Sequence, residues 1–298
     1  MHVLNRLTEL LSVAGSISEY NSLTIDRPKS IVLWHGMGDT YNSTGIRRAE
    51  QVFKEEIPGV FVHSVYLDID EAKDQRASII GDLNTQVLDV CDQLNSIPEL
   101  QNGYDAVGFS QGGLFLRSAI ELCGLPVKTL VTYGSPHNGV TDLPPCAEGN
   151  WLCNQRNEFL KKQIYKDNIQ RTVVQAQYFR DVYNFEAYIE NSAFLKFVNN
   201  EFIKNLDYVD NLTKLEKLVL ILFSQDDMVV PKETAWYFDL DPVTNELIPF
   251  NETSSFQNDL IGLKTLYEQQ KIDFLSIDDF HMRIDEDHLR FIAQKYFK

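Results

Sequence analysis

Short runs of apolar, often β-branched residues alternate with longer segments of helical periodicity along most of the 298-residue chain. This alternation is typical of α/β proteins, in which helices cover both faces of a mostly parallel sheet. The pattern predicts strands at residues 31–35, 60–67, 104–109, 129–133, 218–223 and 272–277. It predicts helices at residues 44–55, 76–94, 111–123 and 286–297. We expect 76–94 to be one continuous amphipathic helix, because its apolar residues fall on a single stripe.

The pentapeptide Gly108-Phe109-Ser110-Gln111-Gly112 lies between a predicted strand and a predicted helix. In that context, Gly-x-Ser-x-Gly is the nucleophile elbow of an α/β-hydrolase. Glycine suits the tight turn because it has no Cβ and tolerates unusual backbone angles. The sequence therefore predicts an α/β-hydrolase fold, with a mostly parallel central sheet covered by helices and with Ser110 exposed at the sheet edge.

One interval, about residues 140–213, has no strand-like run and interrupts the α/β alternation. We predict a single domain over residues 1–298, with this interval forming a helical lid inserted after the sixth strand of the fold. Its apolar residues either line an acyl-chain pocket or hold the lid together. They are Phe159, Leu160, Val173, Val174, Phe185, Tyr188, Phe194, Leu195, Phe197 and Phe202.

A serine nucleophile needs a base, and in this fold an acid and then a histidine follow the serine along the chain. His281 follows the last predicted strand through a short loop, which places it at the same sheet edge as Ser110. His288 is the alternative, but it lies inside the final predicted helix. The acid is expected just after strand 218–223, where Asp226 and Asp227 are both candidates. The pattern Asp-x-x-Val-x-Pro favours Asp226, although both aspartates could instead only end the strand and cap a helix.

An oxyanion hole needs two backbone N–H groups, one of which comes from the residue after the nucleophile. That residue is Gln111. The second donor is expected from Met37, because the flanking Gly36 and Gly38 would allow its N–H to turn inward. This loop lacks the third glycine of a dinucleotide-binding fingerprint and the lysine of a P-loop. We expect the neighbouring His35 to hold the loop by hydrogen bonds.

The chain is strongly acidic, with 27 lysines and arginines against 43 aspartates and glutamates. The net charge of −16 argues against a nucleic-acid partner. Solubility is its simplest explanation, and adaptation to an acidic compartment is a second one. The four cysteines have no zinc-ligand spacing, and we expect neither a metal nor another cofactor.

The sequence gives mixed signs of a secretory route. Three Asn-x-Ser/Thr sequons make Asn42, Asn211 and Asn251 glycosylation candidates. Residues 1–20 are interrupted by Arg6 and Glu9, so we expect a short amphipathic helix there and find no evident signal peptide. No segment has the ~18 apolar residues of a membrane span.

Two blocks of the chain together resemble the palmitoyl-protein thioesterases, and more closely the lysosomal type that removes long acyl chains from cysteine. They are Trp34-His35-Gly36-Met37-Gly38-Asp39, and Gly108-Phe109-Ser110-Gln111-Gly112-Gly113 followed by Phe115-Leu116-Arg117. The similarity runs from about residue 30 to the C-terminus. It implies that Ser110 is the nucleophile, Asp226 the acid and His281 the base. It also implies Met37 and Gln111 as oxyanion donors.

The resemblance implies hydrolysis of thioester-linked, palmitate-like acyl groups through an acyl-serine intermediate. The expected partners are S-acylated proteins or peptides, or other fatty acyl thioesters, and we expect a monomer. The implied compartment is the lysosome or vacuole, or a secreted state. The implied disulfides join Cys91 to Cys123 and Cys146 to Cys153. The family's cysteine pair after the oxyanion loop is absent, because Tyr41, Asn42 and Ser43 stand there.

Two other functions use the same elements. A lipase or carboxylesterase acting on oxygen esters would have the same triad. A catalytically inactive homologue that binds lipid or protein would have the same fold, but the presence of all three triad residues in order argues against it.

Overall fold

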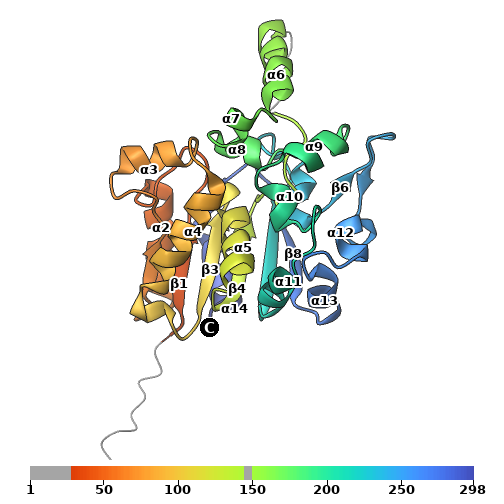
Figure 1. Cartoon of the computed structure of the whole chain (residues 1–298). Helices are drawn as coiled ribbons and strands as arrows, with labels where there is room; N and C mark the ends of the chain where they lie inside the picture. The colour runs from red at the N-terminus through yellow and green to blue at the C-terminus, as the bar shows by residue number, and fades with distance from the viewer. Residues whose placement is uncertain (1–27, 144–149) are drawn as a thin grey trace, which may run out of the picture.

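The computed structural model describes residues 28–143 and 150–298. Its centre is a sheet of six parallel strands in the order β2-β1-β3-β4-β5-β8 (Figure 1). The strands are β1 (Ser30–Trp34), β2 (Val62–Ser64), β3 (Tyr104–Phe109), β4 (Val127–Tyr133), β5 (Lys217–Phe223) and β8 (Ile272–Ile277). All six predicted strands are confirmed. Only β2, which lies at the sheet edge and pairs with β1, is much shorter than predicted.

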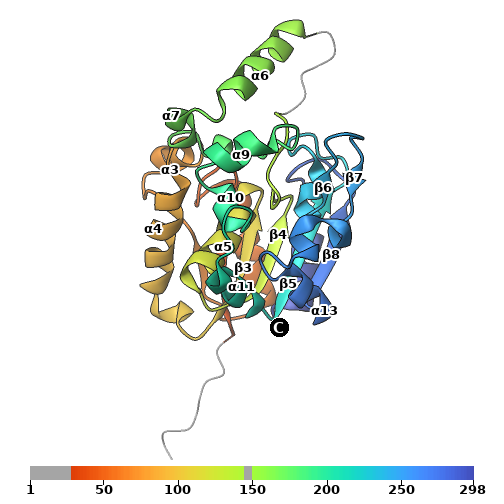
Figure 2. The same ribbon diagram turned by 45° about the vertical axis from the view of Figure 1, so that its right-hand side comes forward.

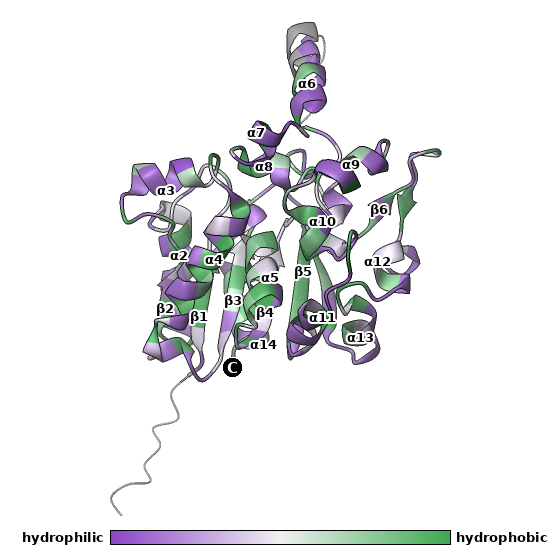
Figure 3. Cartoon of the chain, in the orientation of Figure 1, coloured by the Kyte–Doolittle hydropathy of each residue, from purple (hydrophilic) through white to green (hydrophobic). Residues whose placement is uncertain are grey.

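Alternate residues of each strand point to opposite faces of the sheet and into two separate cores. On β1, Val32 and Trp34 join one apolar cluster, while Ile31 and Leu33 join the other. The first core is covered by α4 (Leu83–Asn95), α5 (Gln111–Cys123) and α11 (Leu206–Thr213); the second is covered by α2 (Thr44–Glu56) and α14 (Glu286–Tyr296). Figure 3 shows the apolar residues of the strands gathered between these helices. This is the predicted α/β-hydrolase architecture.

The prediction of one helix over residues 76–94 is wrong. The chain forms α3 (Glu71–Ala77) and α4, and residues 78–82 separate the two helices. Asp82 begins the second helix, because its carboxylate accepts hydrogen bonds from the N–H groups of Asn84 and Thr85. Ile80 is 45% exposed and so does not belong to the buried stripe on which the prediction rested.

The segment between the two helices pairs with a distant part of the chain. Val174 N–H donates to the carbonyl of Ile79, and Ile80 forms an antiparallel bridge with Val173. Gly81 packs closely against Gln86, since a Cβ at this position would lie 2.0 Å from the side-chain nitrogen of Gln86 and would displace that side chain.

Between β4 and β5, the described residues form helices and no strand element. These helices are α6 (Trp151–Gln163), α7 (Asp167–Gln170), α8 (Val174–Gln177), α9 (Phe185–Asn191), α10 (Leu195–Val198) and α11. The first of them projects away from the rest of the molecule, as two views of the ribbon show (Figures 1 and 2). The others cover the C-terminal edge and one face of the sheet.

The region between β5 and β8 contains short elements that sequence periodicity does not reveal. They are the antiparallel pair β6 (Asp239–Leu240) and β7 (Leu247–Ile248), and the helices α12 (Ser254–Gln257) and α13 (Leu263–Glu268). In the described part of the chain, no helix is long and apolar enough to cross a bilayer.

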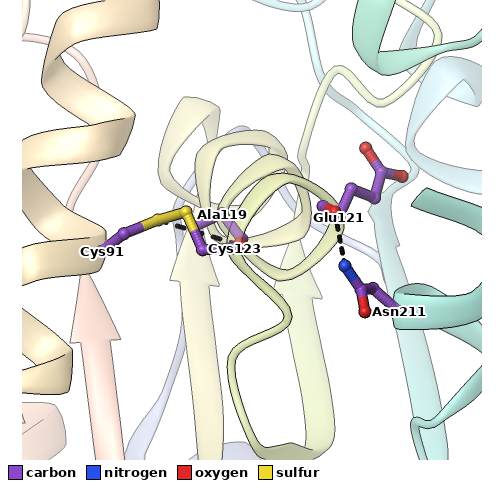
Figure 4. The surroundings of a disulfide bond; sticks show 5 residues. All are labelled: Cys91, Ala119, Glu121, Cys123 and Asn211. Carbon is purple, nitrogen blue, oxygen red and sulfur yellow. Dashed lines mark hydrogen bonds between the residues drawn. A yellow bond between two sulfur atoms is a disulfide. The ribbon is translucent and has the colours of Figure 1, made fainter. Parts of the chain in front are cut away.

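A disulfide bond joins Cys91 of α4 to Cys123 at the end of α5, with a Cα–Cα distance of 6.3 Å (Figure 4). It ties together the two helices that flank the sheet next to the elbow, and it confirms the first implied pairing. The second pairing, Cys146–Cys153, involves Cys146, which lies outside the described residues, as does the predicted helix in residues 1–20.

Candidate active site

Ser110 occupies the turn between β3 and α5 in a strained conformation, with φ of 53° and ψ of −126°. The glycines around it allow this turn to pack. A Cβ on Gly108 would lie 2.2 Å from Gly113 Cα, and a Cβ on Gly112 would lie 2.3 Å from the carbonyl oxygen of Trp34. Such distances exclude any side chain at these positions. The backbone strain at Ser110 is of the kind that clusters at functional sites.

Ser110, His281 and Asp226 form a continuous hydrogen-bonded chain. His281 Nε2 lies 2.9 Å from Ser110 Oγ, and His281 Nδ1 lies 2.5 Å from Asp226 Oδ2. The three residues follow β3, β8 and β5 respectively, so the parallel sheet delivers all of them to its C-terminal edge. This arrangement can remove the hydroxyl proton of a serine and stabilise the imidazolium that results.

The surrounding contacts hold Asp226 and His281 in place. The second oxygen of Asp226, Oδ1, accepts hydrogen bonds from Met228 N–H at 2.8 Å and Val229 N–H at 3.0 Å. The ring of Phe223 meets the imidazole of His281 edge-on, with centroids 5.9 Å apart. The Asp226 side chain is only 1% exposed, whereas His281 is 12% exposed. The carboxylate is thus fixed and shielded, while the imidazole keeps access to the cavity.

The alternative candidates lie elsewhere. Asp227 is exposed. The Nδ1 atom of His288, in α14, lies 3.1 Å from the hydroxyl of Tyr133, and the ring has no bond to Ser110. Burial lowers the pKa of His288, and the nearby Asp285 carboxylate only partly offsets this effect. The structure therefore brings Asp226 and His281, rather than Asp227 and His288, to Ser110.

The loop after β1 approaches Ser110 closely. A Cβ on Gly36 would lie 3.1 Å from Ser110 Cβ, and Met37 lines the same cavity as the serine. Gln111 begins α5, so its backbone N–H has no partner within the helix and is available to a ligand. Both predicted oxyanion donors are therefore next to Ser110.

His35 sits at the base of this loop and is buried. Its Nδ1 lies 3.0 Å from the carbonyl oxygen of Gly36, and its Nε2 lies 3.1 Å from Asp74 Oδ2. Burial raises the pKa of Asp74, but hydrogen bonds from His35 and from the N–H groups of Leu67 and Tyr41 outweigh it and lower the pKa overall. The ionised Asp74 thus anchors the loop.

A cavity of about 730 Å³ opens beside Ser110 and His281. Of the ten apolar residues that the sequence marked in 140–213, only Leu160 and Val173 line it. Val174, Tyr188, Phe194 and Leu195 are instead buried in the core. Phe159, Phe185, Phe197 and Phe202 are exposed.

Most of the cavity wall comes from residues that the sequence did not single out. They include Ile46, Ala49, Ile164, Ile169, Ala176, Tyr178, Phe179, Met282, Ile284 and Leu289. They come from α2, from the loop after β8 and the first turn of α14, and from the segment between β4 and β5, so no single stretch of sequence carries the signal. Among the described residues, no group of three or more His, Cys, Asp or Glu side chains could hold a metal ion.

Comparison of the sequence with known proteins identifies a matching family and several relatives. The palmitoyl protein thioesterase family model matches residues 30–281. Palmitoyl-protein thioesterase 1 of Caenorhabditis elegans is 39% identical over 292 residues, which cover 97% of each chain. A palmitoyl-protein thioesterase–dolichyl pyrophosphate phosphatase fusion of Schizosaccharomyces pombe is 33% identical over 90% of this chain and 43% of its own length.

An esterase of Pyrococcus furiosus is among the solved structures that resemble the chain. It has 13% sequence identity and a TM-score of 0.48, and the match covers 92% of this chain and 84% of that one. The family model spans most of the chain, and Met37, Ser110, Asp226 and His281 all lie within the matched range. The chain belongs to the palmitoyl protein thioesterase family.

Proposed function

We propose that the protein is a serine thioesterase that removes long-chain, palmitate-like acyl groups from cysteines of S-acylated proteins or peptides. The observation that carries this proposal is the Ser110–His281–Asp226 hydrogen-bonded chain beside a large apolar cavity, in a chain of the palmitoyl protein thioesterase family. In this proposal Ser110 is the nucleophile, His281 the general base and Asp226 the acid that orients it.

The first half-reaction acylates the enzyme. Ser110 Oγ attacks the thioester carbonyl carbon while His281 Nε2 takes the hydroxyl proton. The backbone N–H groups of Met37 and Gln111 stabilise the oxyanion of the tetrahedral intermediate, a contribution worth ~2.7–4 kcal/mol for each donor. The intermediate then collapses, the C–S bond breaks, and the cysteine sulfur leaves with the proton held by His281.

The second half-reaction releases the fatty acid. Water enters, gives a proton to His281 Nε2 and attacks the carbonyl of the acyl-serine. The second tetrahedral intermediate collapses with return of the proton to Ser110 Oγ. Free fatty acid and the original enzyme result, and no cofactor is needed in either step.

The cavity has the size and the walls that an acyl chain requires. Its volume lies within the ~300–1,000 Å³ that small-molecule sites occupy, and apolar side chains dominate its lining. We propose that residues 140–213 act as the lid of this site within a single domain, since Leu160, Ile164 and Tyr178 of that interval line the cavity.

We further propose that the protein acts in the lysosome or vacuole, or in the secretory pathway. The support is the resemblance to the lysosomal type, the three sequons and the Cys91–Cys123 disulfide, which persists in oxidising compartments.

Matched substrates test the reaction. Turnover of a palmitoyl-cysteine peptide is compared with that of the same peptide carrying palmitoyl-serine. We expect faster hydrolysis of the thioester, with no hydrolysis by Ser110→Ala. Faster turnover of the oxygen ester would identify a lipase or carboxylesterase instead.

A fluorophosphonate probe should label the wild type and not Ser110→Ala. Absence of labelling in both proteins would indicate an inactive binding homologue.

A further inference from the structure

Ser78 occupies the break between α3 and α4 and is only 2% exposed. Its hydroxyl accepts a hydrogen bond from Gly38 N–H at 2.8 Å and donates its own O–H to the carbonyl of Gln75 at 2.6 Å. The first bond acts on the peptide group that links Met37 to Gly38. It therefore restrains the backbone directly after the residue that supplies one proposed oxyanion donor.

The backbone carbonyl of Ser78 holds the side chain of Gln111, the residue that supplies the other proposed oxyanion donor. Ser78 O accepts a hydrogen bond from Gln111 Nε2 at 2.9 Å and another from Gln175 Nε2 at 3.0 Å. Gln111 is itself only 1% exposed, so its side chain has little freedom apart from these bonds. Ser78 is thus in direct contact with both segments of the proposed oxyanion hole, which are separated by more than seventy positions in the sequence.

Gln175, in α8, and Tyr178, directly after that helix, also contact the side chain of Gln111. Its side-chain oxygen accepts hydrogen bonds from Gln175 Nε2 at 3.0 Å and from the hydroxyl of Tyr178 at 3.1 Å. Gln75 adds a bond from its side-chain nitrogen to the carbonyl of Gly38 at 2.6 Å. Both donor segments are therefore held by polar bonds on more than one side.

We propose that Ser78 is a positioning residue that fixes the two oxyanion donors, Met37 and Gln111, relative to each other, and that Gln175 and Tyr178 support it. This inference rests on the proposed function. Preorganised donors are effective only when they are aimed at the position that the oxyanion will occupy, and small displacements cost rate. Ser78 makes no contact with the reacting atoms, so its effect passes entirely through the donors.

The substitution Ser78→Ala tests the proposal, because it removes the bond to Gly38 and keeps the backbone carbonyl. We expect a drop in kcat/KM of about tenfold, below the ~10²–10³ that follows the loss of a whole donor. Affinity for a trifluoromethyl ketone, which forms a tetrahedral adduct with serine, should fall in parallel. The Kd of a thioether analogue of the substrate, which has no carbonyl, should stay within about twofold.

Ser96→Ala is the matched control. Ser96 is the residue at the C-terminal end of α4, and its hydroxyl donates to the carbonyl three positions earlier, as that of Ser78 does. It has no bond to the oxyanion segments. We expect unchanged kcat/KM for this variant, whereas an equal loss in both variants would mean that Ser78 only stabilises the helix end.

Tyr178→Phe provides a second route if Ser78→Ala does not fold. It removes one hydrogen bond to Gln111, and we expect a smaller loss of the same kind, with kcat/KM and ketone affinity falling together. Unchanged kcat/KM in folded Ser78→Ala and Tyr178→Phe would overturn the inference while leaving the proposed function intact. Failure of the wild type to hydrolyse acyl thioesters would overturn the proposed function itself.

Discussion

His281 Nε2 lies 2.9 Å from Ser110 Oγ, although 171 positions separate the two residues in the chain. They meet because β3 and β8 run parallel and both end at the same edge of the sheet. No local sequence signal encodes this distance. It follows from the strand order, which also brings Asp226 to the other side of the imidazole.

Substitution of the two C-terminal histidines separates their roles. We expect His281→Ala to lose nearly all thioesterase activity, since Ser110 would have no base within reach. His288→Ala should retain most of it, because the His288 ring lies within hydrogen-bond distance of the Tyr133 hydroxyl and has no bond to Ser110. Steady-state hydrolysis of a palmitoyl-cysteine peptide measures both. The opposite ranking would show that His288 is the base.

The glycine at position 108 is expected to be indispensable for folding. Its Cβ in Gly108→Ala would lie 2.2 Å from Gly113 Cα, so backbone must move, and we expect a loss of at least about 3 kcal/mol in unfolding free energy. Gly45→Ala is the control, because in α2 its Cβ would have only Ser43 Oγ nearby, at 3.9 Å. Denaturant unfolding compares them. Equal midpoints for both variants would contradict the close packing at the elbow.

The Cys91–Cys123 disulfide should contribute to stability through the unfolded chain. It closes a loop of 32 residues, for which loop entropy predicts roughly 3–4 kcal/mol. We expect the free energy of unfolding of the double variant Cys91→Ala/Cys123→Ala to be lower by that amount. The variant should therefore unfold at a lower denaturant concentration. Wild-type protein measured with reductant serves as the comparison. A double variant as stable as the oxidised wild type would show that the bond does not constrain the unfolded state.

Stability should fall in acid partly because of His137. Burial, and then the charge of Arg117, lower the pKa of this imidazole well below its ordinary value of 6.5. Above pH 6.5, His137 is neutral in both the folded and the unfolded protein. Below it, the unfolded chain binds a proton that the folded protein excludes, so folding loses up to ~1.4 kcal/mol per pH unit.

The test compares unfolding free energies of wild type and His137→Gln between pH 7.5 and 5. We expect the difference between them to shrink as the pH falls through 6.5, because only the wild type loses this contribution. Parallel profiles would show that His137 does not titrate in this way.

The three sequons should differ in glycan occupancy on secretory expression. Asn211 Nδ2, the atom that would carry a glycan, donates to the carbonyl of Glu121 at 2.9 Å beside the end of α5 (Figure 4). Asn251 is exposed. We expect peptide mapping by mass spectrometry to find a glycan on Asn251 and none on Asn211. A glycan on Asn211 would contradict the expectation that its bond to Glu121 keeps this side chain from modification.

The sequence predicted the bounds of an element most accurately where residues at its two ends mark where it begins and ends. Strands β3 and β8 and helix α5 have the predicted bounds, since each is bounded by turn residues or by the elbow itself. The prediction was wrong over 76–94. There a continuous apolar stripe concealed the cap at Asp82 and the tight packing of Gly81, and the break is stabilised by pairing with residues 173 and 174.

By itself, the sequence determined the fold and the elbow, because both depend on residue types at short spacing. It limited the acid to Asp226 or Asp227 and the histidine to His281 or His288. Only the tertiary structure decided which acid and which histidine reach the serine, which residues line the cavity, and that Ser78 joins the two oxyanion segments. Those relationships depend on distances between residues far apart in the chain, and such distances are set by strand order and packing.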